Sequence, residues 1–203
     1  MTVYFIGAGP GDPELLTLKA LKAIQAATVL LVDDLVSQAI VDFAAPDARI
    51  IYVGKRGGCK STPQAFIEKL MEAEVHKGER VVRLKGGDPY VFGRGGEEAA
   101  DCESWGIPVE TVPGITSAVA VPGAAGIPLT FREVSRAFTV ASGHVPFDDD
   151  ELAGFAQLLG TGATLVVLMG VSTLPQLVSG LMRAGASPEL PIAVVEKGFS
   201  PDQ

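Results

Sequence analysis

Residues 81–98 read VVRLKGGDPYVFGRGGEE, and this stretch joins a predicted buried strand to a glycine-rich loop and a charged helix start. Glycine has no Cβ, so the backbone amides and carbonyls of such a loop can touch a small molecule directly. A long hairpin or a disordered loop is the alternative, although glycine clusters that follow a strand more often bind ligands. We therefore expect a ligand site here, formed around Gly86, Gly87, Gly93, Gly95 and Gly96.

Short apolar segments alternate with helical patterns on both sides of this stretch. Such alternation is typical of an α/β protein with a parallel sheet. Helices are expected to begin at Asp12-Pro13 and Thr62-Pro63, because Asp and Thr cap helices and proline suits the first helical position. The strands are predicted at 2–7, 28–33, 49–53, 79–85, 108–112, 137–142, 163–169 and 191–195, with helices near 63–77 and 118–125.

The Pro113-Gly114 break is the expected domain boundary. It divides the chain into an N-terminal domain with a parallel sheet, residues 1–112, and a mixed α/β C-terminal domain, residues 113–203. Both lie at the small end of the usual range of domain sizes. One continuous sheet is the alternative.

The composition is that of an ordinary globular chain: 203 residues, 47% hydrophobic and 20% charged. A formal net charge of -8 argues against a nucleic-acid-binding face, which would be basic. Local Arg and Lys side chains must therefore hold any acidic ligand. The two cysteines suggest reduced thiols in a cytoplasmic protein. The two histidines do not indicate a metal site. His144 follows an apolar strand, however, where loop residues often meet ligands. With no basic leader and no apolar run of about 18 residues, neither a signal peptide nor a membrane span is expected.

A second glycine turn, residues 7–13, resembles a dinucleotide-binding fingerprint, because it joins a strand to a helix and Asp33 follows about 20 residues later. Its details argue against that function. Asp12 replaces the third glycine, Pro10 has no amide hydrogen, and the Asp12 carboxylate would cap the helix where a phosphate would bind. Residues 54–61 are likewise no P-loop, since Cys59 stands where glycine is needed, and no G-x-S-x-G elbow supports a serine hydrolase.

The carboxyl ends of parallel strands meet at one edge of a sheet, which is where open α/β sheets bind ligands. Here those ends carry residues 7–10, Asp33, Lys55 and residues 86–88. Asp33 and Lys55 would bring a carboxylate and an amine to one crevice, as an acid and base pair requires. A structural ion pair or two solvated side chains are equally open alternatives.

Stretches along nearly the whole chain are similar to one family. The matching segments are residues 3–18, 32–37, 53–56, 81–98, 112–118, 126–130 and 168–170. In this order they resemble the tetrapyrrole methylase family, which uses S-adenosylmethionine. The segments VRLKGGDP and VPGITS resemble the branch of the family that methylates uroporphyrinogen III.

The resemblance implies a two-domain α/β methylase, usually a homodimer, with the methyl donor S-adenosylmethionine in a cleft between the domains and no metal. The implied reaction methylates two pyrrole carbons of uroporphyrinogen III in turn, giving precorrin-2 for sirohaem and cobalamin and S-adenosylhomocysteine from the donor. Asp33 matches the family's proton acceptor and Lys55 its proton donor. The residues that match its donor contacts are Pro10, Gly86, Gly87, Asp88, Val91, Thr116, Ser117, Met169 and Gly198.

The residue types agree with these ligands. The donor is a sulfonium cation without phosphate, so carbonyls of glycine turns and the carboxylate of Asp88 can hold it. The acceptor carries eight carboxylates, which need local cations, and Arg is the side chain best suited to them. The candidates are Arg56, Arg94, Arg132 and Arg136, for which surface solubility is the alternative role.

Two positions depart from the family pattern. Asp34 stands where members usually have Arg, and Phe131 stands where they have His. Relatives also continue beyond Gln203, so the C-terminal domain is expected to lack its last strands. Two alternatives to an active enzyme of this branch stay open: a catalytically silent homologue that binds a ligand or a partner chain, and a methylase of a later corrin precursor.

Overall fold

The computed structural model describes residues 2–54 and 63–199 of the chain. These residues form two compact units. The first unit comprises the chain up to Thr116 together with the residues from Lys197 onward, and the second is Ser117–Glu196. The predicted division into domains 1–112 and 113–203 stays a prediction.

The first unit contains a sheet of parallel strands in the order β3-β2-β4-β1-β5. The strands are β1 (Val3–Gly7), β2 (Val29–Val32), β3 (Arg49–Tyr52), β4 (Val81–Lys85) and β5 (Val109–Val112). Every residue of β2 and β4 is buried, as expected for central strands of a sheet that is covered on both faces. The strands predicted in this part of the chain and the α/β fold are confirmed.

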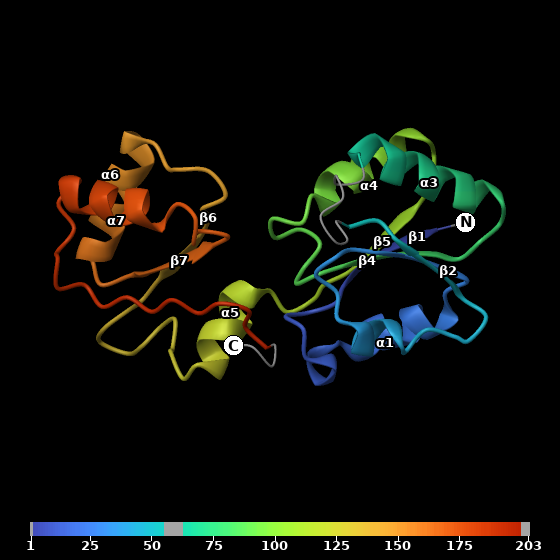
Figure 1. Ribbon diagram of the computed structural model, residues 1–203, viewed down its shortest axis with the longest axis horizontal. Helices are drawn as coiled ribbons and strands as arrows, with labels where there is room; N and C mark the ends of the chain where they lie inside the picture. The colour runs from blue at the N-terminus through green and yellow to red at the C-terminus, as the bar shows by residue number, and fades with distance from the viewer. Residues whose placement is uncertain (1, 55–62, 200–203) are drawn as a thin grey trace. The chain divides into compact units, whose positions relative to one another are not determined.

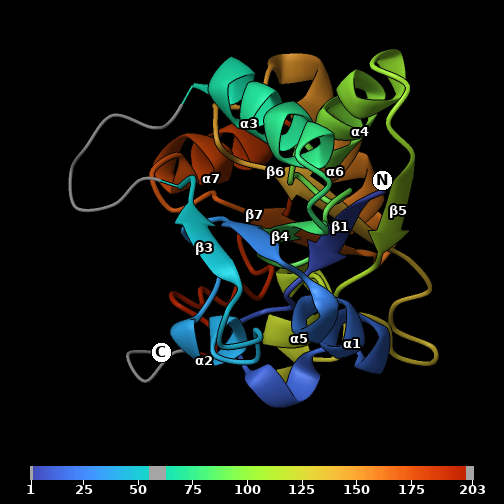
Figure 2. The same cartoon turned by 90° about the vertical axis from the view of Figure 1, so that its right-hand side faces the viewer.

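Helices cover both faces of this sheet, as Figures 1 and 2 show. On one face lie α3 (Gln64–His76) and α4 (Gly95–Ser104), and on the other α1 (Leu18–Ala26) and α2 (Gln38–Val41). The chain leaving β4 therefore goes to the opposite face from the chains leaving β1 and β2, which flank β4 in the sheet. Neighbouring connections that diverge in this way mark the part of a parallel sheet edge where ligands usually bind.

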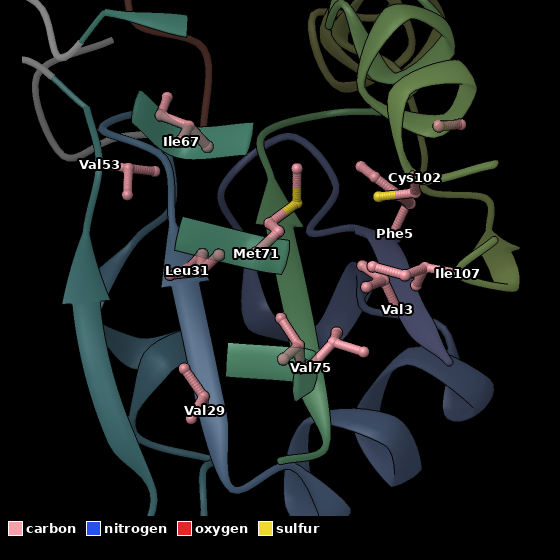
Figure 3. Packing of buried hydrophobic residues seen from close by; sticks show 12 residues of the cluster. Val3, Phe5, Val29, Leu31, Val53, Ile67, Met71, Val75, Cys102 and Ile107 are labelled. Atoms are coloured by element: carbon pink, nitrogen blue, oxygen red, sulfur yellow. The ribbon is translucent and has the colours of Figure 1, made fainter. Parts of the chain in front are cut away.

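Each face of the sheet buries its own apolar cluster. Ile67, Met71 and Val75 recur at the spacing of one helix face, so α3 packs this face against strand residues such as Leu31 (Figure 3). On the opposite face, Ile24 of α1 packs with residues of β2 and β4. These two clusters hold the sheet in the middle of the unit and fix the edge at which its strands end.

The predicted helix starts differ from the structure in detail. The Asp12 carboxylate accepts a hydrogen bond from the Glu14 amide at 2.8 Å, and Pro13 begins the short 3-10 helix η1 (Pro13–Leu15). The α-helix itself, α1, begins only after Thr17, which caps it. For α3, Pro63 is the N-cap rather than the first helical residue, and Thr62 lies outside the described residues.

The second unit contains the parallel pair β6 (Phe138–Ser142) and β7 (Thr164–Leu168). Its helices are α5 (Ser117–Ala124), α6 (Asp149–Gly160) and α7 (Leu174–Arg183). Asp148 and Glu151 form a reciprocal capping box at the start of α6, which explains the run of acidic residues there. Gly180 lets α7 approach α6, because a Cβ at this position would lie 2.5 Å from a methyl carbon of Leu152.

The prediction of a strand at 191–195 is wrong. These residues pair with none of the described strands, and Ile192 and Val194 are 65% and 59% exposed. A short apolar run forms a strand only where a neighbouring strand pairs with its backbone, and the run itself cannot show that neighbour. The described strands form two separate sheets, so one continuous sheet is excluded for this part of the chain.

Candidate active site

Asp33 follows β2 at the carboxyl edge of the first unit's sheet, where two cations hold its carboxylate. Its Oδ1 accepts a hydrogen bond from Nη2 of Arg83 at 2.6 Å, and Nζ of Lys85 lies 3.5 Å from its Oδ2. The Asp33 side chain is 27% exposed, whereas those of Arg83 and Lys85 are 2% and 3% exposed. Solvent can therefore reach the carboxylate from one side, while the cations hold it from within the protein.

The strand register explains why these three side chains meet. In the parallel pair of β2 and β4, Leu31 lies opposite Arg83 and Val32 opposite Leu84. Side chains alternate between the two faces along a strand, so Leu31 and Asp33 point to the same face as Arg83 and Lys85. This is the face that α3 and α4 cover.

Glu98 of α4 joins the same group of charges. Its oxygens accept hydrogen bonds from Arg83 Nε and Nη2, both at 3.1 Å, and from Lys85 Nζ at 3.1 and 3.2 Å. Asp33, Arg83, Lys85 and Glu98, here called the ion cluster, thus balance two positive charges with two negative ones. Among the described residues, no buried side-chain nitrogen or oxygen lacks a hydrogen-bond partner. The buried charges are therefore compensated, as burial requires.

Beside the ion cluster, the backbones of three loops meet at Gly7, Gly87 and Gly114, here called the glycine junction. A Cβ on Gly114 would lie 2.1 Å from the Gly87 carbonyl oxygen, and one on Gly7 would lie 2.4 Å from the Gly114 nitrogen. Gly87 has φ +64, and the nearest atom to its missing Cβ, Cα of Thr116 at 3.9 Å, lies at an ordinary van der Waals distance. Glycine at 7 and 114 therefore serves the close approach of backbones, and glycine at 87 serves the left-handed turn.

The Asp88 carboxylate fastens this junction. Its Oδ2 accepts a hydrogen bond from the Gly114 amide at 3.1 Å, and its Oδ1 accepts one from the Tyr90 amide at 2.8 Å. Both oxygens are thus engaged by backbone donors of the protein. The sequence suggested this carboxylate as a partner of the donor's positive charge; in the structure it also sets the shape of the loop that carries Gly86 and Gly87.

The turn at residues 7–13 has no free anion slot at its helix start. The Asp12 side chain occupies the first turn of η1 through its bond to the Glu14 amide. A phosphate at this position would meet a carboxylate instead of unpaired amides. The objection to a dinucleotide, which the sequence raised, therefore holds in the structure.

The residues that match the family's donor contacts fall into both units. Those of the first unit are Pro10, Gly86, Gly87, Asp88, Val91, Thr116 and Gly198, and those of the second are Ser117 and Met169. Within the first unit, Gly9 and Gly87 exchange backbone hydrogen bonds at 3.1 and 2.8 Å, which joins the loop of Pro10 to that of Gly86–Asp88. Phe199, next to Gly198, lies 3.7 Å from where a Cβ on Gly11 would be.

In the second unit, Met169 follows β7 with φ +59, an uncommon conformation for a side-chain-bearing residue. The buried Thr173 hydroxyl, at the start of α7, lies 2.7 Å from the Gly143 carbonyl oxygen and 3.2 Å from that of Gly170. Thr173 thus ties together the loops that follow β6 and β7. The Met169 side chain is half exposed at this edge.

The predicted cations are dispersed. Arg94 is exposed and paired with Glu97, and the hydrogen bond to Glu97 raises the pKa of the guanidinium. Arg94 also lines an open depression of about 290 Å³ at the start of α4. Arg132 and Arg136 are exposed in the second unit. Lys55 and Arg56 lie outside the described residues, so the predicted meeting of Asp33 with Lys55 stays a prediction.

Sequence reasoning missed the partners that Asp33 has in the structure. Arg83 and Lys85 were assigned to the strand that leads into the loop, and Glu98 to a charged helix start. One signal could have found them. Arg83 and Lys85 are positively charged residues two positions apart in an otherwise apolar strand, and such buried cations need an acidic side chain on the same face of the sheet. That face is set by the pairing of β2 with β4, which are far apart in sequence.

Among residues 2–54 and 63–199, no three His, Cys, Asp or Glu side chains are grouped as a metal ion would require. None of the helices in these ranges has the length and apolar character needed to cross a membrane.

Comparison with known proteins gives the same family throughout. A family model described as Tetrapyrrole (Corrin/Porphyrin) Methylases matches residues 2–203. The uroporphyrinogen-III C-methyltransferase of Pseudomonas aeruginosa is 50% identical over 194 residues, which cover 96% of this chain and 78% of that protein. Its counterpart in Methanocaldococcus jannaschii is 48% identical over 202 residues, covering 99% and 83%.

A solved structure extends the likeness to three dimensions. Uroporphyrin-III C-methyl transferase from Thermus thermophilus, complexed with S-adenyl homocysteine, has a TM-score of 0.80 and 40% identity, covering 99% of this chain and 80% of that one. The parallel sheet, the glycine turns at its carboxyl edge and these matches lead to one conclusion: the chain belongs to the tetrapyrrole (corrin/porphyrin) methylases.

Proposed function

We propose that this protein is an S-adenosylmethionine-dependent methyltransferase that methylates two pyrrole carbons of uroporphyrinogen III in turn to give precorrin-2. Membership of the family, and relatives named for this reaction that the chain covers over most of their length, support the proposal. Within the structure, the observation that carries it is the Asp33 carboxylate held by Arg83 and Lys85 at the sheet edge. The exposed side of this carboxylate is open to a substrate proton.

The residues at this edge fit S-adenosylmethionine better than a phosphorylated nucleotide. The donor's sulfonium is a cation and needs carbonyl oxygens and carboxylates rather than an anion slot. Gly86 and Gly87 carry no side chains at this edge, whereas Asp12 fills the nearby helix start with a negative charge. We propose that Pro10, Gly86, Gly87, Asp88, Val91, Thr116, Ser117, Met169 and Gly198 contact the donor.

We propose Asp33 as the proton acceptor and Lys55 as the proton donor. When bound, S-adenosylmethionine supplies an electrophilic methyl group, and a pyrrole carbon that gains this group leaves its ring with a proton to lose. Asp33 Oδ1 accepts the hydrogen bond of Arg83, while Oδ2 lies 3.5 Å from Lys85 Nζ and is the oxygen that we propose takes this proton. General-base help of this kind contributes about 10²-fold to 10⁴-fold to the rate.

The acidic side chains of the substrate need cations, since the protein as a whole carries a formal charge of -8. We propose Arg56, Arg94, Arg132 and Arg136 for this purpose, because a guanidinium forms paired hydrogen bonds with a carboxylate.

Three further properties rest on the family resemblance. We propose that the protein acts as a homodimer, that it works in the cytoplasm, and that its product serves cobalamin as well as sirohaem synthesis. Sedimentation of the purified protein tests the first of these, with a single species of twice the chain mass as the expected result.

Mass spectrometry of the product tests the reaction. Uroporphyrinogen III and S-adenosylmethionine are incubated anaerobically with the protein, and the tetrapyrrole is expected to gain two methyl groups. Donor binding without any transfer would favour the catalytically silent homologue, and transfer only to a later corrin precursor would favour the other methylase.

Substitution of Asp33 tests the proposed base. Asp33→Asn should lower turnover about 10²-fold to 10⁴-fold and leave donor affinity unchanged by calorimetry. Asp42→Asn is the matched control, since Asp42 is exposed at the end of α2 and bonded to Gln38. Full turnover in the Asp33 variant would remove this residue from the mechanism.

A further inference from the structure

Glu98 is an acidic residue whose side chain is buried, so its carboxylate contacts protein groups instead of solvent. Its side chain is 1% exposed, and its two oxygens receive hydrogen bonds from Arg83, Lys85 and Gln64, the last at 2.9 Å. Glu98 itself lies too deep to meet a substrate. Its contacts lead instead to Asp33, because both of its cationic partners also contact that carboxylate.

The position of Glu98 is fixed by the way α4 begins. A Cβ on Gly95 would lie 2.4 Å from the Pro89 carbonyl oxygen, so glycine allows the helix start to press against the preceding loop. Arg94, the N-cap, has φ +57, which turns the chain sharply into the helix. Glu98 then lies in the first turn, where a negative charge is favourable. The same glycine loop that borders the ligand edge thereby sets the depth of the Glu98 carboxylate.

Glu98 is the acid that holds both cations beside Asp33, although Arg83 also donates from Nη1 to the carbonyl oxygens of Leu31 and Leu84, both at 3.4 Å. Arg83 uses Nε and Nη2 on Glu98 and the same Nη2 on Asp33, so its guanidinium plane is fixed by the buried acid. Lys85 contacts both oxygens of Glu98 at 3.1 and 3.2 Å but stands 3.5 Å from Asp33. Without the Glu98 charge, two buried cations would share the single, partly exposed carboxylate of Asp33, and at least one of them would have to turn toward water.

We propose that Glu98 is a positioning residue for the methyl transfer: through Arg83 and Lys85 it fixes the place and orientation of the Asp33 carboxylate. The proposal rests on the proposed function, in which Asp33 is the proton acceptor. A displacement of about 1 Å at a reacting group can cost about 10²-fold in rate. Glu98 therefore acts on turnover rather than on donor binding.

Glu98→Gln is the first test, because it keeps the shape of the side chain and removes its charge. We expect kcat to fall about 10-fold to 100-fold, while the KM for the donor stays within about twofold. Glu103→Gln is the matched control, since Glu103 lies exposed near the end of the same helix. A Glu98 variant with the kcat of the control would overturn the proposal.

A double-mutant cycle separates positioning from mere support of the fold. If Glu98 acts through Asp33, Glu98→Gln should lower kcat no further in an Asp33→Asn background. An equal fall in both backgrounds would mean that Glu98 only supports the fold, and the proposal would be wrong. An Asp33→Asn protein with full turnover would also overturn it, because Glu98 would then have no base to position.

Glu98→Asp covers the case in which the glutamine variant does not fold. It retains the buried charge but withdraws the carboxylate by one methylene, so kcat should fall although the cluster stays neutral. A crystal structure of either variant gives a result that is independent of activity. An Asp33 carboxylate in its original place, still bonded to Arg83, would refute positioning. If the unaltered protein methylated nothing, the proposed function would fail, and this structural result would still decide the role of Glu98.

Discussion

Replacing Gly114 with alanine tests whether the glycine junction holds the sheet edge together. The new Cβ would lie 2.1 Å from the Gly87 carbonyl oxygen and 2.7 Å from the Cα and carbonyl carbon of Gly7. Contacts of a Cβ below 3.0 Å essentially do not occur, and here both neighbours are backbone. At least one of the three loops must therefore move.

The size of the effect follows from what such a movement breaks. The paired backbone bonds of Gly9 with Gly87, at 3.1 and 2.8 Å, and the Gly114 bond to Asp88, at 3.1 Å, all cross the junction. A net hydrogen bond contributes about 0.5–1.5 kcal/mol, and overpacking costs about 1–3 kcal/mol. We expect Gly114→Ala to lower the free energy of unfolding by about 2–5 kcal/mol.

Urea unfolding followed by tryptophan fluorescence measures this loss. Trp105 is the single tryptophan and packs against the apolar cluster under α3 and α4, so it reports on the first unit and does not require both units to unfold together. Gly96→Ala is the control in the same unit, because nothing lies within 4 Å of its missing Cβ. It should be as stable as the unaltered protein or up to about 1 kcal/mol more stable. If Gly114→Ala unfolded like this control, the close approach would not matter.

Three further substitutions or treatments probe other parts of the chain. Hydrogen bonds from Arg49 and then Lys77 lower the pKa of buried Glu74. The contribution of this carboxylate to stability is therefore full above about pH 4.5 and is lost as the pH falls through the folded-state pKa. Glu74→Gln should lower the free energy of unfolding in urea by about 1–3 kcal/mol at neutral pH, and the difference from the unaltered protein should shrink in acid. Burial, and then Glu98, raises the pKa of Cys102 to about 11, so in a Cys59→Ser protein a thiol reagent should label Cys102 only on unfolding, and rapid labelling of the native protein would contradict this. Thr173→Val removes the hydroxyl that ties Gly143 to Gly170 and should weaken donor binding in calorimetry, whereas Thr173→Ser should retain it; equal affinities would exclude a role for the hydroxyl.

Local signals in the sequence predicted the parts of the fold that depend on neighbouring residues. The strand at Val81–Lys85, the helix after Gly95 and the cap at Asp12 follow from residue types within a few positions of each other. The same kind of signal failed at residues 191–195, because a strand also needs a partner that lies elsewhere in the chain.

The candidate site shows the same limit. The glycines and Asp33 could be found at strand ends, since parallel strands bring their carboxyl ends to one edge. The pairing of Asp33 with Arg83 could not, because it depends on β2 lying next to β4 in a register that sets Leu31 opposite Arg83. A shift of one residue would have turned these side chains to opposite faces.

Arg83 and Arg94 differ in burial, and this difference determines whether each can change its partner. Arg83 is enclosed with Glu98, and leaving such a charge unpaired costs about 3–5 kcal/mol, so it cannot exchange its partner for a substrate carboxylate. Arg94 is paired with Glu97 on the surface, where a salt bridge is worth only about 0–1 kcal/mol, so a competing carboxylate can displace Glu97 at little cost. A protein with a formal charge of -8 can thus keep one cation fixed beside the proposed proton acceptor and leave another accessible at the surface, as the proposed binding of an acidic substrate requires. The difference between the two lies in solvent exposure, because the guanidinium group is the same in both.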